Sequence, residues 1–248
     1  VNWVECSFVG LANLADCLEV VRKEVYELRR LSLRQLHAIL KANYEGYEPE
    51  RRRFASAYPK YGNDCGEVDA HVAQTVAFCT AECARYKMLP DGSPFVPGAF
   101  CWVMHERLGR ETGATPDGRR AGEPFADGAG PAQGRESRGP TCAILSTTSW
   151  DHAPLIGGVA FNMKFNTSLF SSADSFERLR DLVETYLGRG GFETQINVVD
   201  TETLKKARAN PEPYRDLVVR IGGYTDYFTR LSPEMQDEVI QRTEYTAL

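Results

Sequence analysis

The second half of the chain alternates between strand-like and helix-like segments, and this alternation constrains the fold more than any other feature. Residues 159–166 place Phe161, Met163 and Phe165 on one face, as a strand does. Residues 172–188 have the amphipathic period of a helix, which we expect Gly188 to close. Strands that alternate with helices are typical of an α/β sheet with buried parallel strands. We therefore predict strands at residues 141–150, 159–166, 192–200 and 216–221, with residues 216–221 as the last strand of the chain.

Two further helices of this half carry clear start signals. Asp200 can accept a hydrogen bond from the first turn of a helix over residues 201–209. Ser232 and Pro233 suit the N-cap and first position of a final helix over residues 233–243.

The first third of the chain is predicted to be mainly helical. Residues 11–30 show an amphipathic period, Ser32 and Gln35 form a capping-box pattern, and a long helix is expected at about residues 67–87. Residues 89–140 are instead rich in Gly, Pro, Asp and Arg. Aromatic residues scattered through this segment favour an ordered loop over disorder.

Composition narrows the classes of function. The 248 residues suffice for one large domain or two small ones, and the net charge of −5 gives no general attraction to nucleic acid or anionic membranes. No apolar run approaches the roughly 20 residues of a membrane span. Seven irregularly spaced cysteines argue against a secreted disulfide framework and favour a reduced, cytoplasmic setting. Cys79 and Cys83 lie one helical turn apart without a nearby partner pair, so we expect buried cysteines and no metal.

The sequence "VVRIGGYTDYF", residues 218–228, poses the main functional question. Two glycines separate an apolar strand from three aromatic residues. Glycine turns chains readily because it tolerates positive φ. A simple turn is the expectation for Gly222, whereas Gly223 invites a second interpretation.

The segment resembles the C-terminal signature of glycyl radical enzymes, the pyruvate formate-lyase and diol-dehydratase family. Residue by residue, Arg220, Ile221, Gly222, Gly223 and Tyr224 match it, and Gly223 corresponds to the radical glycine. Three more blocks resemble the family in the same order along the chain, at residues 8–27, 114–128 and 190–204. The likeness therefore covers essentially the whole chain, and it favours the dehydratase-like branch.

The resemblance implies the chemistry and the partners. A separate S-adenosylmethionine-dependent iron–sulfur enzyme would generate a radical on Gly223, which would pass to a cysteine thiol and then to a small-molecule substrate. We expect an apolar shell around Gly223, formed by the flanking residues Val218, Val219, Ile221, Tyr224, Tyr227 and Phe228. No cofactor would be bound to the chain itself, and the intact enzyme would be a cytoplasmic homodimer.

The catalytic cysteine of that family has no counterpart here. No Gly-Cys dipeptide occurs, and Cys6 follows Glu5, so we interpret Cys6 as a buried structural cysteine. The chain also begins with Val and has no signal-peptide pattern, which favours the C-terminal part of a longer enzyme whose N-terminal portion is missing.

The predicted fold is the C-terminal part of a glycyl-radical-enzyme α/β barrel, with a buried radical loop. We expect residues 1–110 to form the end of its helical part and residues 111–248 the glycine radical domain. Gln195 and Asn197 share one strand face and could line the substrate pocket, although packing or backbone hydrogen bonding would explain them equally well.

Three functions are compatible with this sequence. The first is a lyase or dehydratase that cleaves C–O, C–N or C–C bonds anaerobically. The second is a stand-alone spare-part subunit, or an inactive remnant, that docks on a larger enzyme. The third is an α/β binding domain without radical chemistry.

Overall fold

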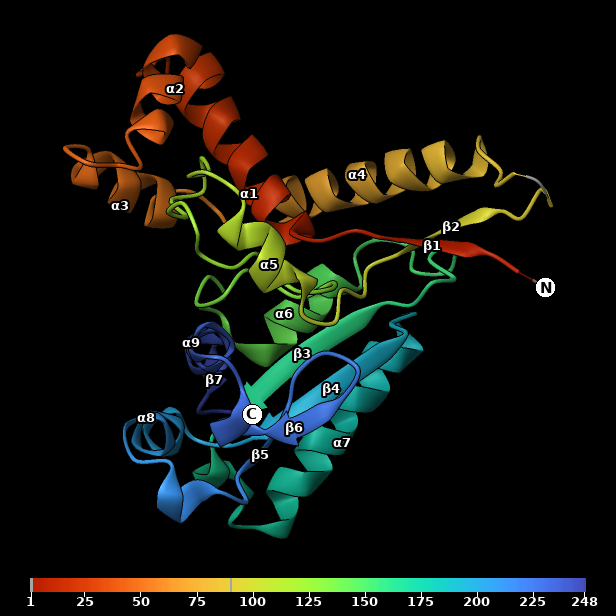
Figure 1. Cartoon of the computed structure of the whole chain (residues 1–248), viewed down its shortest axis with the longest axis vertical. Helices are drawn as coiled ribbons and strands as arrows, with labels where there is room; N and C mark the ends of the chain where they lie inside the picture. Colours follow the sequence, from red (N-terminus) through yellow and green to blue (C-terminus); the bar gives the residue numbers. More distant parts are fainter. Residues whose placement is uncertain (1, 90) are drawn as a thin grey trace.

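The computed structural model describes residues 2–89 and 91–248. Its first part is mainly helical, as predicted, and Figure 1 shows the helices of residues 11–84 gathered at one end of the molecule. The capping box at Ser32 and Gln35 is confirmed, with the Gln35 amide donating to the Ser32 side chain. The elements are β1 (Val4–Ser7), α1 (Leu11–Val21), which continues as a π-helical segment (Arg22–Glu27), α2 (Leu33–Lys41), α3 (Glu48–Ser56), α4 (Gly66–Ala84), β2 (Phe95–Gly98), α5 (Met104–Arg110) and α6 (Gly139–Thr147).

The second part is built on a parallel sheet. Its strands lie in the order β4-β3-β7, and β3 pairs in parallel with both neighbours. A separate antiparallel hairpin, β5–β6, follows β4 and α8 along the chain. The elements are β3 (Ala160–Phe165), α7 (Ala173–Gly188), β4 (Glu193–Val198), α8 (Thr201–Ala209), β5 (Val218–Arg220), β6 (Thr225–Tyr227), α9 (Pro233–Gln241) and β7 (Glu244–Tyr245).

The two faces of β3 and β4 meet different environments. Phe161, Met163 and Phe165 of β3 are buried in one cluster with Tyr186 of α7 and Ile144 of α6. The opposite face carries polar side chains, and the register pairs Asn162 with Gln195 and Lys164 with Asn197. Lys164, Gln195 and Asn197 are buried as well. A buried polar face needs hydrogen-bond partners, and the neighbouring hairpin supplies some of them.

Helix starts were predicted well where a cap residue marked them. Asp200 accepts a hydrogen bond from the Thr203 amide at the start of α8, and Ser232 accepts one from the Met235 amide at the start of α9. Helix α7 does end at Gly188, as predicted. The left-handed backbone conformation that follows the helix is at Gly190, with φ +96°. Gly190 is therefore the residue that provides the turn out of α7.

One strand prediction was wrong, and a second identified a strand correctly but not its place in the order. Most of residues 141–150 belongs to α6, which has Pro140 in its first turn. A short apolar run does not distinguish a buried helix from a buried strand, and the β-branched residues here favoured the wrong choice. Residues 216–221 do contain β5, but β6 and β7 follow it.

The described residues of the Gly- and Pro-rich segment are ordered and contain β2 and α5; Pro90 lies outside the described residues. The Arg119 guanidinium holds its central loop by donating hydrogen bonds of 2.5 Å to the carbonyl oxygens of Gly113 and Glu123. The Arg119 side chain also stacks over the Phe125 ring, 4.2 Å from its centroid. The prediction of an ordered loop is thus confirmed, although β1, β2 and α5 were missed.

Within the two described ranges, none of the helices combines the length and the apolar composition needed to cross a bilayer.

Candidate functional site

Gly223 occupies the tip of the β5–β6 hairpin. The Ile221 amide donates a 2.9 Å hydrogen bond to the Tyr224 carbonyl, which leaves Gly222 and Gly223 as a two-residue turn. Gly223 has φ +81°, in the left-handed region that favours glycine. A β-carbon on Gly223 would also overlap the ring of Phe100. Both the backbone conformation and the neighbouring ring therefore require glycine at this position.

Gly222 has a different role from the one predicted. Its φ lies outside the left-handed region, so Gly222 is not the residue that needs the conformational freedom of the turn. A β-carbon on Gly222 would lie 2.8 Å from the carbonyl oxygen of Trp102. Gly222 is needed because the segment at Trp102 approaches the hairpin closely.

The apolar shell around Gly223 is incomplete in this chain. Val219, Ile221 and Phe228 are fully buried with residues of α8 and α9. By contrast, Val218 is 47% exposed and Tyr227 is 36% exposed. Gly222 is buried but Gly223 itself is exposed. In this chain, therefore, the base of the turn is buried as predicted and its tip is exposed.

Gln195 and Asn197 contact the hairpin from the polar face of β4. The Gln195 side-chain oxygen accepts hydrogen bonds from the Gly223 amide at 3.0 Å and from Nε of Arg220 at 2.9 Å. The Asn197 side chain accepts from the Arg220 amide at 2.7 Å and donates to the Arg220 carbonyl at 2.9 Å. Backbone hydrogen bonding thus accounts for both residues here, and pocket lining stays a prediction.

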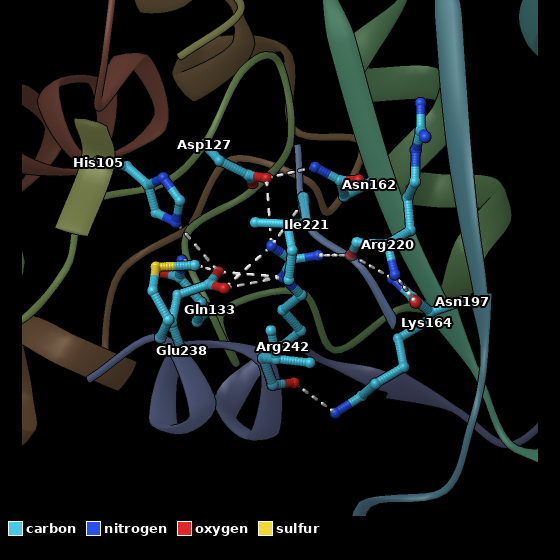
Figure 2. Close-up of polar contacts among 12 residues, drawn as sticks. His105, Asp127, Gln133, Asn162, Lys164, Asn197, Arg220, Ile221, Glu238 and Arg242 are labelled. Atoms are coloured by element: carbon cyan, nitrogen blue, oxygen red, sulfur yellow. Dashed lines mark hydrogen bonds and ion pairs between the residues drawn. The ribbon is translucent and has the colours of Figure 1, made fainter. Parts of the chain in front are cut away.

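Arg242, immediately after α9, holds the other side of the hairpin (Figure 2). Its guanidinium donates hydrogen bonds to the carbonyl oxygens of Arg220, at 3.1 Å, and Ile221, at 3.0 Å. The same group forms a 2.9 Å ion pair with Glu238, whose side chain is fully buried. Asp127 lies 3.8 Å from the guanidinium and accepts a hydrogen bond from Asn162.

His105 extends this buried charge network. Its Nε2 lies 3.5 Å from a carboxylate oxygen of Glu238, and its Nδ1 lies 3.6 Å from the Cys101 sulfur. Burial disfavours the charged imidazolium, but the contacts with Cys101 and Glu238 outweigh it and raise the pKa of His105 to about 10. The neighbouring Arg242 and His105 hold the pKa of Glu238 well below its usual range, despite burial. The network is therefore charged at neutral pH.

Sequence reasoning missed this network. The only sequence signal was the i, i+4 spacing of Glu238 and Arg242 at the end of the last helix. That spacing is common on exposed helices, and nothing in it indicates burial beside the hairpin.

The cysteines differ in part from the prediction. Cys6 lies in β1 and is only half-buried, because it lines an open apolar groove of about 450 Å³. Cys79 and Cys83 line the same groove, and of the three only Cys83 is buried. Among the described residues, no three His, Cys, Asp or Glu side chains are grouped so that they could hold a metal ion.

Two family models match the chain. The model described as "Glycine radical" matches residues 125–229, which include the β5–β6 hairpin. The model described as "Pyruvate formate lyase-like" matches residues 1–109.

Curated relatives agree with these models. The chain is 38% identical to "Probable dehydratase YbiW" of Escherichia coli over 98% of its own length and 31% of that protein. It is 32% identical to "Trans-4-hydroxy-L-proline dehydratase" of Clostridioides difficile over 96% of its length and 30% of the relative. The chain thus spans about 30% of the length of these relatives.

The fold is shared with solved structures. The glycerol-bound form of the B12-independent glycerol dehydratase from Clostridium butyricum superposes with a TM-score of 0.94 at 34% identity. That likeness covers 99% of this chain and 31% of the dehydratase. It confirms the predicted α/β fold class. Together with the two family models, these likenesses show that the chain belongs to the glycyl radical enzyme family.

Proposed function

We propose that this chain is the C-terminal part of a glycyl radical lyase or dehydratase and that Gly223 stores its radical. The observation that carries the proposal is the position of Gly223 at the tip of a hairpin whose amide and carbonyl groups are held from two sides. Such a residue can be fixed in place while its α-carbon stays accessible.

The chemistry of the α-carbon supports this role. Removing a hydrogen atom from a glycine α-carbon leaves a radical that is delocalised over the adjoining amide nitrogen and carbonyl. That delocalisation favours a planar centre, and a side chain would crowd it. At Gly223 a side chain is already excluded by the left-handed φ and by the Phe100 ring.

The exposed tip of the hairpin defines what the rest of the enzyme must do. The thiol that receives the radical would come from the N-terminal portion, because this chain has no counterpart of the family's Gly-Cys loop. We propose that the missing portion covers the exposed side of Gly223 and completes a cytoplasmic homodimer. A separate S-adenosylmethionine-dependent iron–sulfur enzyme would install the radical.

The reaction would be anaerobic cleavage of a C–O, C–N or C–C bond in a small molecule. The dehydratase names of the relatives above favour C–O cleavage for this chain. In domain terms, residues 1–110 would end the pyruvate formate-lyase-like part and residues 111–248 would form the glycine radical domain. If Gln195 or Asn197 also lines the substrate pocket, it would do so with the part of its side chain that does not contact the hairpin.

A first experiment separates the enzyme from a spare-part subunit or remnant. The mass of the native protein, identified through a peptide of β5 and β6, should be several-fold larger than 27.7 kDa. A native mass near 27.7 kDa would instead support the spare part or the remnant. The long helical part, which extends well beyond the hairpin, favours the enzyme.

A second experiment tests the radical itself. The anaerobically activated protein should show a doublet in electron paramagnetic resonance, and air should then cleave the backbone at Gly223. Mass spectrometry under denaturing conditions should detect a peptide that begins at Tyr224. An intact chain after verified loss of the doublet would count against Gly223.

A further inference from the structure

Gln195 contacts the Gly223 amide directly, and its orientation is fixed by its neighbours. The side-chain nitrogen donates a 2.8 Å hydrogen bond to Glu193, which turns the oxygen toward the hairpin. That oxygen accepts from the Gly223 amide at 3.0 Å and from Arg220 Nε at 2.9 Å. Gln195 is only 4% exposed, so its rotamer is restricted by packing on β4.

The two donors come from different parts of the hairpin. Arg220 ends β5 and Gly223 occupies the tip, so one oxygen atom joins the strand to the glycine. Arg242 fixes the carbonyl oxygens of Arg220 and Ile221, but its hydrogen bonds stop before Gly223. Among the side-chain hydrogen bonds of the described residues, the only one that involves the main chain of Gly223 is the one its amide donates to Gln195.

We propose that Gln195 is a positioning residue that tunes the radical on Gly223 through the amide hydrogen bond. The inference rests on Gly223 being the radical residue. The spin on the α-carbon is shared with the amide nitrogen, and an acceptor on the N–H increases the electron density that the nitrogen can donate. Losing the acceptor reduces this delocalisation and lets the peptide plane rotate relative to the α-carbon.

The variant that removes the acceptor should still fold. Gln195→Met keeps the length of the side chain, and both orphaned donors can reach water, since Gly223 is exposed and Arg220 is half-buried. The double variant Glu193→Gln/Gln195→Glu keeps an acceptor oxygen beside Arg220, exchanges donor and acceptor in the contact between residues 193 and 195, and serves as the rescue variant. Gln236→Met is the matched control, because Gln236 is a buried glutamine that donates to the Phe228 carbonyl at 3.0 Å and has no hydrogen bond to Gly223.

Amide hydrogen exchange of the unactivated protein tests the contact without any radical. Exchange at Gly223 should accelerate about two- to tenfold in Gln195→Met, the factor expected for one net hydrogen bond. The exchange rate at Gly223 should stay near that of the wild type in Glu193→Gln/Gln195→Glu and in Gln236→Met. Equal exchange in Gln195→Met and wild type would overturn the contact on which the proposal rests.

Electron paramagnetic resonance of the anaerobically activated protein tests the tuning. The spin shared with the Gly223 amide nitrogen should appear as a hyperfine coupling that changes on 15N labelling of the protein. In Gln195→Met this nitrogen coupling should become smaller and the anaerobic half-life of the doublet should fall about two- to tenfold, whereas the double variant Glu193→Gln/Gln195→Glu should restore both. An unchanged spectrum and half-life in Gln195→Met would overturn the inference alone. Absence of any doublet in the wild type after confirmed activation would overturn the proposed function and the inference with it.

Discussion

The guanidinium of Arg242 donates a 3.0 Å hydrogen bond to the carbonyl oxygen of Ile221, two residues before Gly223. This contact joins the end of the last helix to the base of the hairpin. Because Arg242 is also paired with the buried Glu238, the position of the hairpin depends on a charge network in the protein interior.

Replacing Arg242 with Met should destabilise the protein by about 3–5 kcal/mol, because it leaves the buried carboxylate of Glu238 without its main counter-charge. The free energy of unfolding in urea measures the effect. Arg178→Met is the matched control, since Arg178 pairs with Asp174 on the surface, where both side chains are more than half exposed. The control should change stability by no more than about 1 kcal/mol. Similar losses in the two variants would contradict a special role for the buried pair.

The stability of the protein should depend on pH through His105. Its pKa is raised from the ordinary 6.5 to about 10 in the folded state, so the folded state holds this proton more tightly than the unfolded state does. The stabilisation is therefore complete below about pH 6.5 and is lost as the pH rises toward 10.

Melting temperatures of wild type and His105→Gln from pH 6 to 10 test this prediction. The gap between them should be largest near pH 6 and should narrow as the pH rises. The difference in melting temperature between the two proteins cancels the effect of groups that titrate in both. One such group is Lys164, because burial lowers its pKa to about 8. His37→Gln, at an exposed helical position, should show no such narrowing. A constant gap for His105→Gln would argue against the ion pair with Glu238.

Asn197→Ala should loosen the hairpin at Arg220. The Asn197 side chain accepts from the Arg220 amide and donates to the Arg220 carbonyl, which also accepts from Arg242. The substitution therefore leaves only the partly buried amide unpaired, at a cost of about 1–3 kcal/mol. Hydrogen exchange at the Arg220 amide should accelerate in Asn197→Ala. Asn197→Asp retains an acceptor and should protect that amide better than alanine does. If the two variants exchange alike, the hydrogen bond does not limit opening at Arg220.

Gly223→Ala should be more harmful than a comparable substitution at another left-handed glycine. Gly190 has φ +96° and a β-carbon there would meet no atom within 4 Å, so Gly190→Ala incurs backbone strain of about 1–2 kcal/mol alone. Gly223→Ala adds the overlap with Phe100. Only Gly223→Ala should abolish the paramagnetic doublet after activation. A doublet that persists would place the radical on another residue.

Local signals predicted the fold where a single residue determines an element. Asp200 and Ser232 mark the starts of α8 and α9 correctly, because a cap acts within one turn of its own position. Residues 141–150 were assigned wrongly, because their apolar pattern suits a helix and a strand equally and the surrounding packing decided between them.

The candidate site was predictable only in part, because the packing around it is not encoded in any local sequence pattern. The alternation along β4 placed Gln195 and Asn197 on one face correctly, but it could not reveal that this polar face is the buried one. Gln195 is 4% exposed, whereas Val198 on the apolar face is 46% exposed. The contacts of Phe100 with Gly223 and of His105 with Glu238 join segments that are far apart in sequence. No local pattern encodes such pairs.

The pairing of β7 with β3 has a consequence for the oxygen cleavage proposed at Gly223. Residues after Gly223 include α9 and β7, and they are tied to the rest of the chain by the burial of Glu238 and Arg242 and by backbone pairing with Lys164 and Phe165. A chain broken at Gly223 would therefore remain a non-covalent complex of two pieces under native conditions. Such a nicked molecule would keep its size and most of its shape without an intact Gly223, and any replacement of the cleaved end would first have to displace a folded peptide.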